Sequence, residues 1–456
     1  MKTSASRRLL ATVPALAVAM AMPLAAIAGR IPDLERDTLP AGDGWASLQT
    51  VARPDGTTGG SAADAAHVYT VGDRNALVAA LKYPDPTPKI IRIEGIIDAN
   101  VDANGVPLGC DDHARPDPQT GTPYSLGAFL TAYDPATWGR DNPSGPLERA
   151  RVASAAAQSA RVRIRVPANT TIVGTTRGAG LRGAWLDIRP SSSNGNQPMN
   201  VIVRNLVLED TFDCFPQWSP TDGAQGNWNS AYDSISVRNA THVWVDHNTL
   251  RDRVTTDDTL PSYFGRLYQV HDGLLDVTNE SDLVTVSWNR FEQHDKTMLV
   301  GSSDSAVVDR DKLRITVHHN LFLDLGQRVP RVRYGQIHLY NNHYKLSDDS
   351  AAERYGYSWG VGAESRIYAQ NNHFRVGAAV TPDRFISVSK GTAIHAEGTL
   401  VNGVSEHSTV DVVAAYNASH DTALLPETDW QPTLHGPIEP AGTVPVSVQQ
   451  GAGAFR

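Results

Sequence analysis

A short unit that contains asparagine recurs through the second half of the chain and constrains the fold more than any other feature. In each unit a few β-branched or aromatic residues precede Asn, one further residue and usually an apolar one. A constant unit at unequal spacing indicates constant strands separated by loops of variable length, which is the pattern of a solenoid. The asparagines are Asn205, Asn248, Asn289, Asn320, Asn342, Asn372 and Asn417, at intervals of 43, 41, 31, 22, 30 and 45 residues.

This repeat predicts an all-β fold, a right-handed parallel β-helix with long loops. The repeated strands are short and no helices separate them, so each strand must pair with its equivalent in the next coil. Asn tolerates a left-handed φ, and its side-chain amide can bond the amide of the coil above. One Asn at a bend of each coil therefore favours stacking. A leucine-rich solenoid would need a Leu-x-Leu framework, and the sequence lacks one.

The segment before the repeat has a different pattern. Asp73 stands at the cap position of an apolar segment, residues 74–81, which predicts a short helix capping the solenoid. Residues 90–97 predict a strand broken at Gly95. Residues 101–160 are rich in Pro, Gly and Asp and end in a helical pattern from Leu147 to Ala160, which indicates an insertion on the scaffold.

The chain contains two cysteines, Cys110 and Cys214. In an oxidising compartment they could pair across a long loop, but their spacing does not show it, and two free thiols remain the alternative. Too few cysteines are present for a disulfide framework to hold the fold.

The first 28 residues predict a signal peptide. Lys2, Arg7 and Arg8 precede an apolar run that ends at the small-x-small site Ala26-Ile27-Ala28. No second apolar span follows, so we expect a secreted protein without a membrane anchor. Residues 29–456 would form a single β-helix domain, with residues 376–456 packing along the solenoid or capping its C-terminal end. Cleavage changes the formal net charge from −9 to −12, which argues against nucleic acid as a partner.

Against this acidity, the segment Arg328-Val329-Pro330-Arg331-Val332-Arg333-Tyr334-Gly335 gathers three arginines within six residues. Guanidinium groups stay charged at ordinary pH and match carboxylate and phosphate oxygens. Pro330 fixes its own φ and predicts a bend that brings Arg328 and Arg333 to one side. The segment is either an anion-binding site or a solvated basic turn.

Three aspartates upstream form a candidate cation site. Asp272 and Asp276 would lie about 13 Å apart on a straight strand, but a bend at Gly273 could bring them together. Asp233 lies roughly one coil upstream and could complete the site. Carboxylate oxygens select calcium or magnesium. Lys296, in a β-rich segment further on, is a further candidate, although a single lysine is most often a surface charge.

At this point the chain resembles the polysaccharide lyase family 1 pectate lyases, over about residues 58–372, and most closely the bacterial secreted enzymes. The family's fold is also a right-handed parallel β-helix. The resemblance rests on four ordered motifs, Trp244-Val245-Asp246-His247, Asp272 to Asp276, His294-Asp295-Lys296 and Arg328-Val329-Pro330-Arg331-Val332-Arg333.

The resemblance implies a role for each candidate residue. Arg328 matches the family's catalytic base, and Lys296 and Arg333 match the residues that bind uronate carboxylates, while Arg331 has no settled role. The matched Ca²⁺ ligands are Asp233, Asp272 and Asp276. Some relatives carry a further acidic ligand where this chain has Ala231, so calcium would bind weakly until a substrate carboxylate completes the site.

The implied reaction is calcium-dependent β-elimination of pectate, a 1,4-linked α-galacturonan, by a monomeric enzyme that gives 4,5-unsaturated oligogalacturonates. Retention of the aspartates and of Lys296 favours unesterified pectate. A polygalacturonase would hydrolyse the same polymer with paired carboxylates, but Asp210, Asp213 and Asp246 form no compact pair in the sequence. A non-catalytic carbohydrate-binding solenoid is the third alternative, and Arg328 would be dispensable for it.

Overall fold

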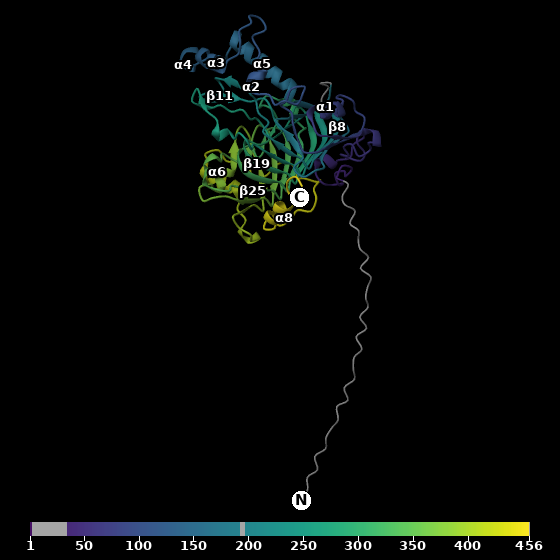
Figure 1. Ribbon diagram of the computed structural model, residues 1–456. Coiled ribbons are helices and arrows are strands. Elements are labelled where there is room, and N and C mark those ends of the chain that lie inside the picture. The colour runs from purple at the N-terminus through teal and green to yellow at the C-terminus, as the bar shows by residue number, and fades with distance from the viewer. Residues whose placement is uncertain (2–33, 192–196, 456) are drawn as a thin grey trace. The chain divides into compact units, whose positions relative to one another are not determined.

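The structure is a computed structural model that describes Met1 and residues 34–191 and 197–455. Residues 2–28 of the predicted signal peptide therefore lie outside the described part of the chain. From Leu34 onward the chain is a right-handed parallel β-helix, which confirms the predicted fold (Figure 1).

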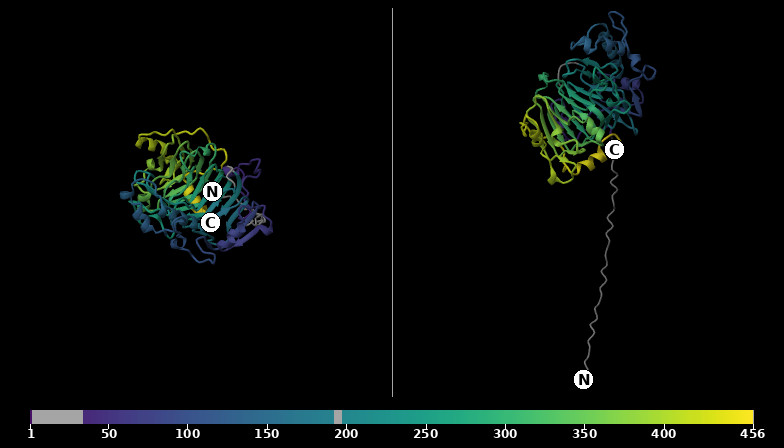
Figure 2. Two further views of the ribbon diagram at one scale, coloured as in Figure 1. Left: turned by 90° about the horizontal axis from the view of Figure 1, so that it is seen from above. Right: turned by 90° about the vertical axis from the view of Figure 1, so that its left-hand side faces the viewer.

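Three long parallel sheets form the walls of the solenoid, and from β4 onward each coil contributes one strand to each wall. From β12 onward the chain visits the eight-, ten- and nine-stranded sheets in strict rotation. The colours in the right-hand view of Figure 2 accordingly run in chain order along the stack of strands.

The strand bounds follow sheet by sheet. The ten-stranded sheet holds β1 (Val68–Val71), β2 (Lys89–Ile93), β5 (Thr170–Gly174), β8 (Gln197–Arg204), β13 (Ala240–Asp246), β18 (Asp282–Ser287), β21 (Arg314–His318), β24 (Gln336–Tyr340), β27 (Arg366–Gln370) and β30 (His395–Glu397). The nine-stranded sheet holds β3 (Ile96–Asp98), β6 (Gly180–Arg182), β9 (Val207–Glu209), β14 (Thr249–Arg251), β19 (Arg290–Lys296), β22 (Leu321–Gln327), β25 (His343–Lys345), β28 (His373–Arg375) and β31 (Leu400–Val401). The eight-stranded sheet holds β4 (Arg163–Val166), β7 (Trp185–Ile188), β12 (Ile235–Arg238), β17 (Leu275–Thr278), β20 (Leu299–Val300), β23 (Arg331–Val332), β26 (Trp359–Val361) and β29 (Ile386–Val388). Two antiparallel pairs lie outside the walls, β10 (Gln217–Ser219) with β11 (Asn227–Asn229) and β15 (Ser262–Tyr263) with β16 (Arg266–Leu267).

The helices lie outside the solenoid or at its ends. α1 (Arg74–Leu81) confirms the predicted helix, with the Asp73 carboxylate accepting the backbone N–H of Ala76, and packs against β1, β2 and β4. The predicted strand at 90–97 is present as β2 and β3, and it breaks at Gly95, whose φ is +68°. The other helices are α2 (Cys110–His113), α3 (Leu126–Ala132), α4 (Pro135–Trp138), α5 (Pro146–Val162), α6 (Asp349–Arg354), α7 (Val412–Ser419) and α8 (Val444–Gly451), and short 3₁₀ helices span Trp45–Ser47, Ala65–His67, Asp257–Thr259, Val307–Asp309, Pro382–Phe385 and Glu406–Ser408.

A ladder of side-chain amides runs along one bend of the solenoid. The backbone N–H of each ladder residue from Asn248 to Asn342 donates to the side-chain oxygen of the Asn one coil on, at 2.8–3.0 Å. Each side chain donates in turn to a main-chain carbonyl of the preceding coil at 2.9–3.0 Å, so no amide is left unpaired. The members are Asn248, Asn289, Asn320, Asn342 and Asn372, all fully buried.

Two details of the predicted repeat are wrong. The left-handed φ belongs to the residue before each ladder position, such as His247 at 51° and Trp288 at 54°. Asn205 is one of these bend residues, and Leu206 occupies the ladder position of its coil, donating its N–H to Asn248. Asn417 lies in helix α7 rather than in a strand, because the solenoid ends at β31 and Asn417 instead exchanges hydrogen bonds with Leu424.

The C-terminal segment first caps the end of the solenoid and then packs along its side. α7 packs on β29 and β30 at the end of the coils. α8 then packs on β22 through the buried side chains of Val444 and Val448, and the Phe455 N–H reaches the side-chain oxygen of Asn205.

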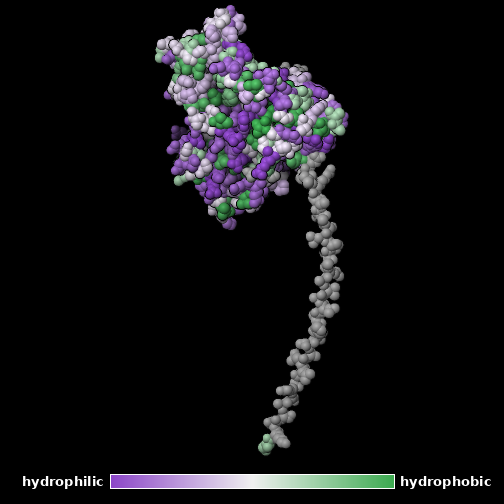
Figure 3. Space-filling view, viewed as in Figure 1, coloured by the Kyte–Doolittle hydropathy of each residue, from purple (hydrophilic) through white to green (hydrophobic). Residues whose placement is uncertain are grey.

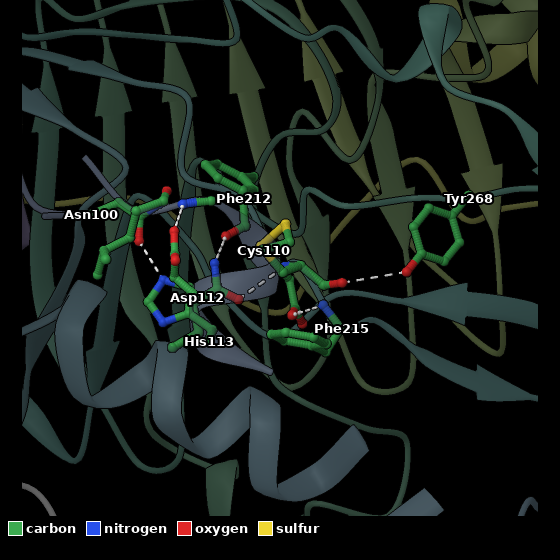
Figure 4. Close-up of a disulfide and its surroundings, with 12 residues drawn as sticks. Asn100, Cys110, Asp112, His113, Phe212, Phe215 and Tyr268 are labelled. Atoms are coloured by element: carbon green, nitrogen blue, oxygen red, sulfur yellow. Dashed lines mark hydrogen bonds between the residues drawn. A yellow bond between two sulfur atoms is a disulfide. The ribbon is translucent and has the colours of Figure 1, made fainter. Parts of the chain in front are cut away.

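The predicted insertion contains helices α2 to α5, which lie together at one end of the ribbon in Figure 1. α5 confirms the helix expected from Leu147 to Ala160 and is slightly longer. Cys110 and Cys214 form a disulfide that ties α2 to the chain after β9, so the disulfide is the alternative that this structure adopts (Figure 4). Tyr268 donates to the Cys214 carbonyl at 3.4 Å, which links the disulfide to the loop before β17.

The described residues contain no helix long and apolar enough to cross a membrane. On the face drawn in Figure 3, hydrophobic residues form scattered patches among hydrophilic ones. The apolar residues of the three walls point inward, where the rings of Phe291, Phe322, Tyr344, Phe374 and Phe385 stack at centroid distances of 3.9–5.2 Å.

We expect Asn320→Ala to destabilise the protein by about 2–4 kcal/mol, because it leaves the buried Asn289 N–H and two carbonyls without their partner. Urea denaturation followed by circular dichroism measures the effect. Asn104→Ala, in an exposed turn, is the matched control. Equal unfolding midpoints for the two variants would show that the ladder does not hold the coils together.

Candidate active site

The eight-stranded sheet and the neighbouring ends of β19 and β22 bring the predicted site residues onto adjacent coils. Asp276 lies on β17 in register with Ser236 of β12, and Arg331 lies on β23 in register with Leu299 of β20. The last residue of β19 is Lys296, and its register partner Gln327 directly precedes Arg328. The parallel register therefore assembles a site from segments that are almost one hundred residues apart in sequence.

Asp233 and Asp276 converge on the backbone of Gly273. Asp233 Oδ1 accepts the Gly273 N–H at 3.0 Å, and Asp276 Oδ1 accepts the Leu299 N–H at 2.9 Å. A Cβ at position 273 would lie 2.3 Å from Asp276 Oδ1 and 3.0 Å from Asp233 Oδ1, so the two oxygens are at most about 5 Å apart. Only glycine leaves the space between these two carboxylates open.

The electrostatics of these carboxylates indicate uncompensated negative charge. Burial, together with the charge of Asp272, raises the pKa of Asp233 to about 7. Burial and the charges of Asp233 and Asp272 also raise the pKa of Asp276 well above its usual value. Like charges that disfavour one another in this way are relieved by protonation or by a cation.

Asp272 differs from the other two carboxylates. Its side chain is partly exposed, and its Oδ1 lies 3.8 Å from the Lys296 ammonium, which is itself buried. Within the part of the chain that the structure describes, no three His, Cys, Asp or Glu side chains are already arranged to hold a metal ion. The donor set nevertheless fits calcium, because two hard carboxylates converge and a third stands beside them.

Sequence reasoning missed a buried charged network beneath this site. His294 donates from Nε2 to the Asp272 carbonyl at 2.7 Å, and its Nδ1 lies 2.6 Å from Asp252. Burial alone would lower the pKa of His294, but the Asp252 and Asp257 carboxylates outweigh burial and raise the pKa to about 9. His271 joins the network through Asp257 at 2.8 Å. His294 lies on β19 and belongs to the motif His294-Asp295-Lys296, but its partners Asp252, Asp257 and His271 lie outside the wall strands, and no spacing in the sequence marks them.

The three arginines of the basic segment have different environments. The Arg328 side chain makes no hydrogen bond or ion pair to any described residue, and its Nε is buried without a partner. Its φ is +59°, a conformation that costs a non-glycine residue about 1–2 kcal/mol, and the Met298 N–H holds its carbonyl at 2.7 Å.

Arg333, in contrast, is anchored. It donates from Nε to Asp304 at 2.6 Å and from a terminal nitrogen to the Gly301 carbonyl at 3.1 Å. The Lys390 ammonium lies 2.9 Å from the other oxygen of Asp304, so one carboxylate supports two cations. Within the described part of the chain, the Arg331 side chain makes one long contact, of 3.5 Å to the Ser389 hydroxyl. Asp304 and Lys390 had no recognisable signal in the sequence.

The carboxylates considered for a hydrolase are engaged elsewhere. Asp246 lies in the ten-stranded sheet and pairs with Arg204 at 2.8 Å, and Asp210 accepts the backbone N–H groups of Arg253 and Val254. Asp213 accepts the backbone N–H groups of Phe215 and Ala231. These bonds give all three residues structural roles.

Comparisons with known proteins agree with one another. A family model described as pectate lyase matches residues 146–423. The chain is 44% identical to a pectate lyase of Bacillus subtilis (strain 168), over 97% of this chain and 98% of that protein. Two solved structures, entitled "Pectate lyase bound to hexasaccharide" and "Structural insights into substrate specificity and the anti beta-elimination mechanism of pectate lyase", align at TM-score 0.83, with 45% and 44% identity, over 92% of this chain and 99% of theirs.

Gly273→Ala tests the convergence of the carboxylates. We expect calcium affinity, measured by isothermal titration calorimetry, to fall at least about tenfold, because the new Cβ displaces Asp276 from Asp233. Gly127→Ala in helix α3 is the matched control, since its Cβ would meet nothing closer than 3.9 Å. Calcium binding by Gly273→Ala at the affinity of the unaltered chain would contradict the arrangement.

Proposed function

Because the chain belongs to the pectate lyase family, and is thus a polysaccharide lyase, we propose that it cleaves pectate, a 1,4-linked α-galacturonan, by calcium-dependent β-elimination. The products would be 4,5-unsaturated oligogalacturonates. The observation that carries this proposal is the unpaired Arg328 on the coil next to Lys296, beside three mutually repelling carboxylates. The titles of the two structural neighbours, one with a bound hexasaccharide and one naming anti β-elimination, support it.

The chemistry requires removal of a weakly acidic proton. The proton at C5 of a uronate is held tightly because the adjacent carboxylate is already negative. Calcium held by Asp233, Asp272 and Asp276 would neutralise that carboxylate and stabilise the charge that develops on it. Lys296 and Arg333 bind uronate carboxylates from the protein side, and the bonds from Arg333 to Asp304 and Gly301 fix its guanidinium before substrate arrives.

Arg328 takes the C5 proton, after which the C4–O4 bond breaks and the leaving oxygen acquires a proton. A guanidinium normally keeps its proton, since the free group has a pKa above about 12. The Arg328 Nε is buried without a hydrogen-bond partner among the described residues, so this position is left for the substrate.

The proposal includes export of the enzyme. Residues 1–28 serve as a signal peptide, and residues 29–456 act as a single secreted domain and as a monomer. The disulfide between Cys110 and Cys214 supports this location, because disulfides persist in oxidising compartments.

One assay tests the reaction. The purified chain is incubated with polygalacturonate and calcium, and both ultraviolet absorbance and reducing ends are followed. A lyase gives absorbing unsaturated ends, a hydrolase gives reducing ends without absorbance, and a binding protein gives neither. We expect Arg328→Lys to reduce the rate about 10²–10⁴-fold with its fold retained, whereas Arg375→Lys, on an exposed strand end, keeps full activity. Near-normal turnover by Arg328→Lys would remove Arg328 from the role of base.

Calcium binding should depend on pH with a definite sign. Since the pKa of Asp233 is raised to about 7 in the metal-free fold, calcium has to displace protons below that pH. We expect calcium affinity, measured by titration calorimetry, to rise from pH 5 to pH 8 and activity to rise from about pH 7 to about pH 9. Without calcium, stability should fall as pH rises from about 4 to about 7, because the folded state then binds more protons than the unfolded chain. Full activity in excess chelator, or pH-independent affinity, would contradict this account.

A further inference from the structure

Four arginines gather on the N-terminal coils, away from the proposed active site. We call Arg163, Arg165, Arg189 and Arg238 the arginine cluster. Arg163 and Arg165 lie on β4, Arg189 directly follows β7, and Arg238 ends β12. These strands belong to the same eight-stranded sheet that carries Asp276 and Arg331.

The register places the cluster on the same face of that sheet as the proposed catalytic groups. Ile164, Leu186, Ile235 and Leu275 point into the core, so the residues that alternate with them point outward. The outward row runs from Arg165 through Asp187 and Ser236 to Asp276. Three strand spacings separate β4 from β17, which is roughly 14 Å. A polymer that leaves the site along the solenoid axis in this direction therefore reaches the cluster.

The cluster carries excess positive charge. Among the described residues its acidic partner is Asp187, which is fully buried and holds Arg163 and Arg238, each through a bond of 2.6 Å. Burial lowers the pKa of Arg163, and the charges of Arg189 and Arg165 lower it further. A cavity of about 540 Å³ between α1, α5 and β4 adjoins the cluster, and its lining includes Arg74 and Lys82 but no acidic residue. Such a charge excess stands out on a chain whose net charge is −9.

Two of the arginines stabilise the fold, and the other two are free to bind an external ligand. Arg163 and Arg238 bind Asp187, and their guanidinium groups lie over the Trp185 ring at 4.8 and 5.0 Å from its centroid. Arg189 lies 3.6 Å from Asp187, and its Nε makes no hydrogen bond to a described residue. Arg165 is exposed and lies over the ring of Tyr83 at 5.3 Å. The guanidinium groups of Arg165 and Arg189 can therefore meet an external carboxylate.

We propose that the arginine cluster is a distal binding site for uronate carboxylates of the polymer, which anchors chains too long to be held by the catalytic groove alone. The ligand identity rests on the proposed function, because it takes the polymer to be a polyuronate. Guanidinium forks suit carboxylates, and the regular spacing of charges along a polyuronate presents several at once. Anchoring at a distance raises affinity for long chains without touching the reacting atoms.

The double variant Arg165→Gln/Arg189→Gln tests the site. We expect KM for polygalacturonate at low salt to rise about three- to tenfold while kcat stays within about twofold. Five strand spacings, roughly 24 Å, separate β4 from β23, which follows Arg328. Tetragalacturonate bound across Arg328 therefore does not reach Arg165, and its KM should not change. Added NaCl at about 0.5 M should abolish the difference between variant and unaltered enzyme by screening the exposed charges. Affinity electrophoresis through a gel containing polygalacturonate measures the same binding without turnover.

The matched control is Lys345→Gln/Arg375→Gln, which removes two cations in register on neighbouring strands of the nine-stranded sheet. This control should leave KM for the polymer unchanged. An unchanged polymer KM in the cluster variant, or an equal rise for tetragalacturonate, would overturn the proposal. Failure of the unaltered enzyme to form absorbing product from either substrate would instead overturn the proposed function, and gel retardation would still report on the cluster.

Discussion

The hydrogen bond from each ladder residue to the asparagine of the next coil is the constraint on which the rest of the structure depends. Each asparagine fixes the rise and rotation between coils at one bend, and its own amide is fully buried and satisfied. Because the ladder sits at the bend between the ten- and nine-stranded sheets, it leaves the loops around the eight-stranded sheet free to vary in length. Those loops carry Asp233, Asp272 and Asp304.

The same register that stabilises the coils creates a local electrostatic problem. Strands spaced about 4.8 Å apart bring Asp233, Asp272 and Asp276 close enough to repel one another, and burial adds to the cost. Main-chain N–H groups hold the Asp233 and Asp276 carboxylates without neutralising them, and His294 holds the main-chain carbonyl of Asp272. A bound cation and a lysine ammonium can then balance the negative charge that the protein alone leaves on these aspartates. The cation can also bind a substrate carboxylate.

The fold and the site were predictable from the sequence to different degrees. The repeat predicted the β-helix because a bend residue leaves a periodic signal, yet it misplaced Asn205 by one position, since bend and ladder are adjacent and both accept asparagine. The prediction for Asn417 was wrong because the motif alone does not show whether another coil follows. The resemblance to a family marked Lys296 and Arg328, whose motifs are local. It could not mark Asp304, Lys390 or His271, whose contacts exist only after distant loops meet.

The positions of the basic residues explain how an acidic protein could bind the polyanionic substrate of the proposed function. A protein with net charge −9 repels a polyuronate at long range, so binding requires positive charge concentrated where the polymer lies. The eight-stranded sheet provides it, with Arg328, Arg331 and Arg333 at one part and the arginine cluster at another. Between them lie the aspartates, which would repel substrate unless a divalent cation reverses their sign. Calcium bound by the aspartates would therefore convert two separate basic regions into one continuous attractive surface, and its proposed role would then extend from the chemical step to the binding of the chain.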